Sequence, residues 1–382
     1  MERTSWGLVL LLFLAGLLAA MQFAKLSLTL GDAAAIWPGR PVAFLVSAVS
    51  VVGVALGAVA GSAVARFGAR PAILWAVAGS GAVSILQAAL PPFGAMLALR
   101  ALEGAGHLAL VVALPTLMAA SASPSMRPVV MGLWGTFFGV GFALGALALG
   151  ALAPWGPRAP YLAHGAACLL LLPALWRMVP SLGLRGAAVP GLLDVHRAIY
   201  GRARLAAPGV AHGIYTSLFI ALVAFLPAAL GALWLTALLP LANLAGTFAA
   251  GVAARRVAPG RIVVTSFAAA AAGFASLAVA PAMAGAAPLA LLTIFATGTL
   301  AGANFAAVPA LNPRSEDQAR ANGGMAQLGN VGTFLGTPAL GLAFALGGAP
   351  ALLGAAAAVS LLGAVAGRAI YGRAGREPAA AG

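Results

Sequence analysis

The sequence has little charge, few acidic residues and almost no cysteine. Only 7% of its 382 residues are Asp, Glu, Lys or Arg, whereas a soluble globular domain carries about 25%. So few charges cannot form a water-compatible surface over a chain that is 62% hydrophobic, which excludes a soluble protein. The single cysteine excludes a disulfide framework and any metal site built from several cysteines.

Motifs for nucleotide binding and hydrolysis are also missing. The sequence contains no Walker loop, no H-E-x-x-H and no G-x-S-x-G, and no polar segment is long enough for a nucleotide-binding domain. We therefore predict no enzyme activity, no cofactor and no metal. The formal net charge of +14 does not indicate nucleic-acid binding, because the cations lie between apolar runs rather than in one patch.

Long apolar runs dominate the sequence. Crossing a hydrocarbon layer of about 30 Å takes roughly 20 apolar residues, and only helices satisfy their own backbone there. With Gly, Pro and Arg as boundary signals, we predict an all-α polytopic membrane protein with twelve transmembrane helices. The expected spans are 6–30, 41–64, 72–91, 94–118, 128–152, 159–178, 205–226, 230–253, 262–282, 286–310, 323–346 and 349–371.

The cations are distributed unevenly between the two sides of these spans. Seventeen of the 21 Lys and Arg residues fall on the side that carries the N-terminus. Because cytoplasmic loops carry the excess of positive charge, we predict that both termini are cytoplasmic. The protein is then expected to be a multi-pass protein of the cytoplasmic (inner) membrane.

The two halves of the chain resemble each other. GSAVARFGAR at 61–70 is echoed by GVAARRVAPGR at 251–261, and GFALGALALG at 141–150 by GTFLGTPALG at 332–341. Similarity repeated over half the chain length indicates a duplicated six-helix unit. The expected organisation is a first half at 1–178, a cytoplasmic connecting loop at 179–204 and a second half with a short tail at 205–382.

The connection between the second and third spans carries a recognisable motif. Gly61, Arg66, Gly68 and Arg70 match the pattern G-x-x-x-D-R-x-G-R-[KR] of the major facilitator superfamily (MFS) of transporters, although Ala65 replaces the acid. Arg100, Gly104 and Gly106 are similar to another motif of that family, R-x-x-x-G-x-G. The chain therefore resembles this family over its whole length, and 102–118 and 129–142 look most like its cyanate-permease-like branch.

Arg66 and Arg70 have two possible roles. They could form a conformational latch, because cations at a helix boundary hold carbonyl groups or an opposing acid in one state only. They could equally be ordinary cytoplasmic anchors. We treat Gly61, Arg66, Gly68 and Arg70 as a candidate gating loop.

Ionisable residues inside the spans are few. Arg100, Glu103 and His107 are spaced i, i+3 and i+7, so they share one helix face. A charge at the bilayer centre costs roughly 2.5–3.5 kcal/mol, so this face must meet a cavity or another helix. Glu103 either handles solute or protons, or only neutralises Arg100.

Further polar groups complete the candidate site. Lys25 either faces a cavity or snorkels to the interface, and Gln22 lies almost one turn before it. The resemblance implies a central cavity lined by the first, fourth, seventh and tenth spans, and each of these carries polar residues. The candidate residues for substrate binding or coupling are Gln22, Lys25, Arg100, Glu103, His107, His212, Tyr215 and Asn304.

The sequence thus predicts a secondary active transporter of a small solute that works by alternating access between two halves. The excess of cations over acids at membrane depth favours an organic or inorganic anion. Proton-coupled efflux of lipophilic compounds is the alternative, and a non-transporting receptor or membrane-embedded enzyme is more remote. Expected partners are the solute, a proton if transport is coupled to one, and the lipid bilayer, with the protein acting as a monomer.

Overall fold

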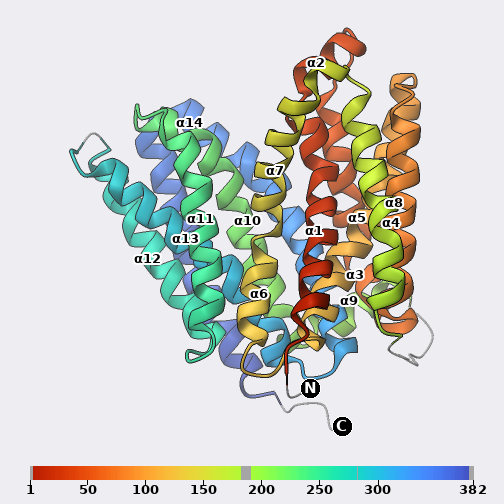
Figure 1. Ribbon diagram of the computed structural model, residues 1–382. Coiled ribbons are helices and arrows are strands. Elements are labelled where there is room, and N and C mark those ends of the chain that lie inside the picture. Colours follow the sequence, from red (N-terminus) through yellow and green to blue (C-terminus); the bar gives the residue numbers. More distant parts are fainter. Residues whose placement is uncertain (1–2, 182–190, 282, 378–382) are drawn as a thin grey trace.

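The computed structural model describes residues 3–181, 191–281 and 283–377, and these are mostly helical, with no strand among them. The helices form two groups that lie side by side (Figure 1). The first group contains α1 (Trp6–Ser27), α2 (Leu30–Ile36), α3 (Ala43–Phe67), α4 (Ala69–Gln87), α5 (Phe93–Ala120), α6 (Arg127–Gly135), α7 (Phe137–Leu152), the short η1 (Ala153–Trp155) and α8 (Ala159–Met178). The second contains α10 (Ala203–Ala229), α11 (Leu235–Ala253), α12 (Pro259–Val279), α13 (Ala286–Leu311) and α14 (Ser315–Ala374), and α9 (Leu192–Tyr200) lies between the groups in sequence.

Eleven helices of the described chain are long and apolar enough to cross a membrane. One of them, α14, has 60 residues and departs from helical geometry at Gly347 and Gly348. A continuous helix of that length would extend about 90 Å, three times the hydrocarbon thickness. Because Gly348 has a φ of 62°, which glycine adopts without strain, the pair makes a tight connection between two spans. The predicted polytopic all-α fold class is therefore confirmed.

Three local features differ from the predicted spans. The expected span 128–152 is divided into α6 and α7 at Thr136, whose hydroxyl and N–H both bond the Leu133 carbonyl and so compete with the regular helical bonding. The predicted loop at 179–204 contains the helix α9, while its centre, 182–190, lies outside the described residues. The chain after α1 forms the unexpected short helix α2.

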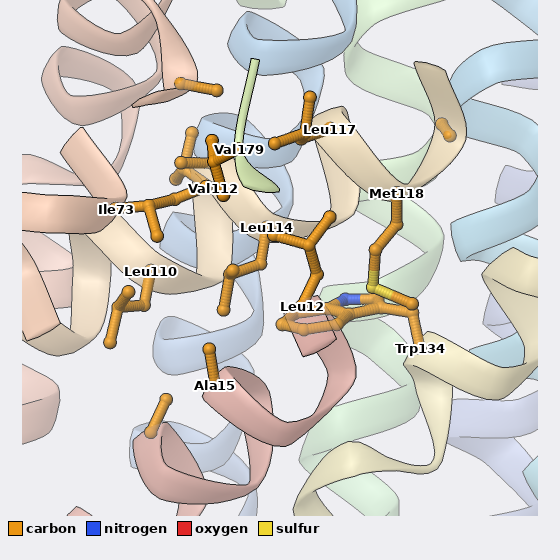
Figure 2. Packing of buried hydrophobic residues seen from close by; sticks show 14 of the residues in the cluster. Leu12, Ala15, Ile73, Leu110, Val112, Leu114, Leu117, Met118, Trp134 and Val179 are labelled. Atoms are coloured by element: carbon orange, nitrogen blue, oxygen red, sulfur yellow. The ribbon is translucent and has the colours of Figure 1, made fainter. Parts of the chain in front are cut away.

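Each group of helices has its own apolar core. In the first, Leu12, Leu114 and Met118 surround the fully buried Trp134 (Figure 2). In the second, the largest fully buried side chains are Phe267 and Phe274. Lipid tails are as apolar as these side chains, so close packing rather than escape from water stabilises such cores.

The two groups are in contact at one end of the molecule. The start of α1, the helix α9 and the end of α14 lie at this end, which we call the terminal end (Figure 1). A Cβ on Gly57 or Gly61 would meet backbone of α14 at 2.8 and 2.7 Å, and one on Gly132 would meet Gly251 of α11 at 2.7 Å. Asn322 Nδ2 also donates to Thr116 Oγ1 across this contact over 3.0 Å. Small residues therefore bring the backbones of the two groups together at the terminal end.

Candidate functional site

A cluster of three charged side chains is buried in the first group of helices. Lys25 Nζ of α1 donates to Glu103 Oε1 of α5 over 2.6 Å. Arg100, three residues before Glu103 on the same helix, donates from Nη1 to the other carboxylate oxygen. The exposed fractions of Lys25, Arg100 and Glu103 are 3%, 0% and 1%. One carboxylate therefore neutralises one of two buried cations, and the charge cluster carries a net charge of +1 when all three are ionised.

Neutral polar groups from α4 and α8 surround the charge cluster. Gln87 Nε2 donates to Glu103 Oε2 over 2.9 Å, so this carboxylate accepts bonds from three side chains. Lys25 Nζ also donates to Ser84 Oγ over 2.8 Å, and His164 Nδ1 lies 3.4 Å from Lys25 Nζ. The Tyr161 ring covers the ammonium at 5.3 Å. The charge cluster thus joins α1, α4, α5 and α8 through one polar network.

Arg100 ties this network to two further backbone groups. Its Nε donates to the Leu45 carbonyl of α3 over 2.9 Å, and its Nη1 donates to the Gln22 carbonyl over 2.8 Å. The Gln22 side chain donates to Ser80 Oγ over 2.8 Å. Arg100 Nη2 and the amide oxygens of Gln22 and Gln87 are buried without a partner in the described chain. Such groups cost free energy unless a water or another ligand meets them.

These contacts show where the side chains of Lys25 and Glu103 lie. Lys25 does not snorkel to the interface, because its ammonium is buried on Glu103 and Ser84. The face of α5 that carries Arg100 and Glu103 meets other helices of its own group. Glu103 neutralises Lys25 as well as Arg100, so it is more than the local partner of one arginine.

His107 lies one turn beyond Glu103 but belongs to a different environment. Its Nδ1 lies 3.0 Å from the Ala19 carbonyl of α1, so this nitrogen carries the proton of the neutral ring. In that tautomer Nε2 is an acceptor, and it has no hydrogen-bond partner among the described residues. The ring also meets Phe23 edge-on at 4.9 Å.

The predicted residues of the second half lie apart from the charge cluster. Tyr215 donates to Asn243 Oδ1 of α11 over 3.0 Å, and Asn304 accepts from Tyr371 of α14 over 3.0 Å. His212 Nδ1 is buried and has no partner in the described part of the chain. The eight candidate residues therefore divide into a charged network in one half and neutral groups in the other.

A continuous row of aromatic rings connects the two halves. Successive ring centroids are 4.3–6.3 Å apart, a range typical of interacting rings. The row crosses between the halves where Trp134 of α6 meets Phe305 of α13. We call this set the aromatic row, and its members in order are His107, Phe23, Phe138, Phe137, Trp134, Phe305, His212, Tyr215 and Phe219.

The members of the candidate gating loop have different surroundings. Gly61 packs against α14, and Gly68 has a φ of 92°, which allows α3 and α4 to join at a single residue. Arg66 stacks on the Phe67 ring at 5.1 Å. Arg70 Nη2 donates to the Trp176 carbonyl of α8 over 2.8 Å. Arg70 is therefore bound within its own half in this conformation.

The sequence prediction did not include several residues of the network. Ser80, Ser84 and Gln87 recur every three or four residues in α4, a spacing that marks one polar face of an otherwise apolar helix. His164 is a rare intramembrane histidine, which is a signal by itself. No group of three His, Cys, Asp or Glu side chains that could hold a metal is present in the described ranges.

Comparison with known proteins relates the first half of the chain to the MFS by sequence. The family model described as Major Facilitator Superfamily matches residues 8–191. The second half is related by structure only, and no curated protein matches the sequence. The matched family model points to a transporter rather than an enzyme. The narrower resemblance to the cyanate-permease-like branch stays a prediction.

Several solved MFS structures share the whole fold. The human organic anion transporter MFSD10 (TETRAN) has a TM-score of 0.74 with 19% identity, covering 94% of this chain and 98% of that one. The proton:xylose symporter XylE also gives 0.74, with 17% identity and 94% coverage of both chains. FucP in its outward conformation gives 0.72, with 15% identity and 95% and 98% coverage. At these identities the likeness shows the fold alone.

Proposed function

We propose that this chain, which has the fold of the major facilitator superfamily, is a secondary transporter of small organic anions with a planar apolar part. The single observation that carries the anion assignment is the charge cluster, in which two buried cations share one carboxylate. The aromatic row supplies the apolar contact. MFSD10, a structure of the same fold, is described as an organic anion transporter.

The contacts between the halves support alternating access. They join small residues at the terminal end, where Gly132 and Gly251 face each other. Small residues are typical of contacts between membrane helices. We infer that the halves exchange this contact for one at the opposite end, which would expose a central solute site to each side in turn.

The aromatic row is the proposed solute surface. His107, Phe138, His212, Phe219 and Phe305 are each only half-buried, so their rings can stack on a planar solute. His107 Nε2, an acceptor without a partner among the described residues, can accept a hydrogen bond from a donor group on the solute. No charged side chain belongs to the row.

The charge cluster attracts an anion without touching it. His107 is one helical turn from Glu103, so a solute on the row lies near the net positive charge. A unit charge roughly 8 Å away contributes about 2 kcal/mol at an effective dielectric constant of about 20. That free energy changes a dissociation constant roughly thirtyfold. We expect it to be lost when Lys25 is neutralised.

Paired compounds test this proposal. Small planar carboxylates and their carboxamides are screened by thermal shift on purified protein, because ligand binding raises apparent stability. The carboxylates should stabilise the wild type more than the amides do, and Lys25→Met should remove the difference. Hits are then assayed for uptake into proteoliposomes. Equal binding of amides would contradict the anion preference, and binding without uptake would contradict transport.

The role of the candidate gating loop is tested by comparing the uptake rate with the solute dissociation constant. If Arg66 belongs to a latch, Arg66→Ala should change the uptake rate far more than the solute dissociation constant. Arg127→Ala is the matched control, because Arg127 also lies at the terminal end and donates to the Ala119 carbonyl of its own half. An equal change in both variants would leave Arg66 as an anchor.

A further inference from the structure

A groove lies on the outer surface of the first half, between α4 and α8. It has a volume of about 550 Å³ and is lined by apolar side chains with one cation at its edge. Pockets for small organic ligands have volumes of about 300–1,000 Å³. Both helices are candidate membrane spans, so hydrocarbon rather than water faces this groove.

The shape of the groove follows from prolines and tryptophans. Pro173 lies inside α8 and Pro71 in the first turn of α4. A proline within a helix removes one backbone hydrogen bond, and both prolines line the groove. Trp75 and Trp176 also line the groove, with exposed fractions of 79% and 66%. Exposed tryptophans are typical of the depth at which lipid headgroups meet acyl chains.

Arg70 gives the groove a charged end. Its Nη2 donates to the Trp176 carbonyl over 2.8 Å, which fixes the guanidinium against the last turn of α8. In the described chain Arg70 has no ion pair, and its remaining N–H groups have no partner. A guanidinium binds phosphate through paired hydrogen bonds. An oriented cation thus lies directly beside an apolar channel.

The geometry points to a binding site for one anionic glycerophospholipid. Its phosphate would bind Arg70, its ester region would lie beside Trp75 and Trp176, and one acyl chain would follow Leu74 and Leu169. Charge complementarity selects this occupant over a zwitterionic lipid, whose own cation competes for the phosphate. The inference depends on α4 and α8 spanning a membrane and is independent of the transported solute.

Native mass spectrometry of the full chain measures the retained lipid. Phosphatidylglycerol should bind more tightly than phosphatidylcholine, and Arg70→Gln should weaken only phosphatidylglycerol, by about tenfold for the loss of a charged hydrogen bond. Arg261→Gln is the matched control, because Arg261 occupies the repeated position at the start of α12. Its phosphatidylglycerol affinity at the groove should equal that of the wild type.

A second measurement keeps the test independent of how well Arg70→Gln folds. Brominated phosphatidylglycerol in vesicles should quench tryptophan fluorescence more than brominated phosphatidylcholine, and Trp75→Phe should remove most of that difference. Equal quenching by the two lipids would overturn the inference. So would equal weakening by Arg261→Gln, or a stable dimer by light scattering that Trp176→Ala dissociates, since a second copy would then cover the groove.

Discussion

Replacing Glu103 by Gln should strongly destabilise the protein. The carboxylate accepts bonds from Lys25, Arg100 and Gln87, and all three charged side chains are at most 3% exposed. The amide has one acceptor oxygen where the carboxylate has two. Glu103→Gln therefore leaves two buried cations without a counter-charge and places an NH₂ group against a donor.

The expected magnitude follows from the burial of the pair. Removing one partner of a buried ion pair costs about 3–5 kcal/mol. A loss of 1 kcal/mol lowers the melting temperature of a domain of 150–250 residues by about 2–4 °C, and each half is of that size. We therefore expect Glu103→Gln to melt about 6–20 °C below the wild type when tryptophan fluorescence of the purified protein is followed during heating.

Lys25→Met is the matched control for charge balance. This change removes the cation that exceeds the acid and leaves the neutral pair of Arg100 and Glu103. The variant loses the bonds from Lys25 Nζ to Glu103 Oε1 and to Ser84 Oγ, but it leaves no buried charge without a counter-charge, so the melting temperature should fall by less than in Glu103→Gln. A Glu103→Gln protein that melts within about 2 °C of the wild type would refute the role of Glu103 as counter-charge. A Lys25→Met protein less stable than Glu103→Gln would refute it as well.

Three further outcomes are expected. Gly251→Ala should open the terminal end, because the added Cβ would lie 2.5 Å from Gly132 Cα. Hydrogen exchange in α6 and α11 should then become faster. In the control Gly79→Ala the added Cβ has nothing within 4 Å, so exchange should stay unchanged. Tyr200→Phe removes the 2.6 Å bond to Gln327 Oε1 and should cost about 0.5–1.5 kcal/mol, seen as faster exchange in α9; unchanged exchange would mean that apolar packing alone holds this helix. A reporter fused to the C-terminal residue should behave as cytoplasmic, and a periplasmic result would contradict the predicted orientation.

Local sequence determined the fold class. In hydrocarbon the backbone N–H and C=O groups can bond only to each other, so the apolar runs specify helices. The Gly347–Gly348 connection was predictable from its glycines and the proline that follows. The division at Thr136 and the helix α9 were not predicted. The division depends on one threonine that bonds a carbonyl three residues before it. The helix α9 depends on partners distant in sequence, since Val195 and Ile199 pack in a cluster with residues of α3 and α14.

The candidate site divides in the same way. The sequence by itself identified Lys25, Arg100 and Glu103, because ionisable residues at membrane depth are rare and costly. Only the tertiary structure decided that one carboxylate serves both cations and that α4 and α8 supply the remaining partners. The aromatic row could not be predicted from sequence periodicity either, because its rings come from six helices and become neighbours only when the two halves meet. Composition fixes what must be buried in a membrane, whereas the packing of helices distant in sequence fixes which buried groups become partners.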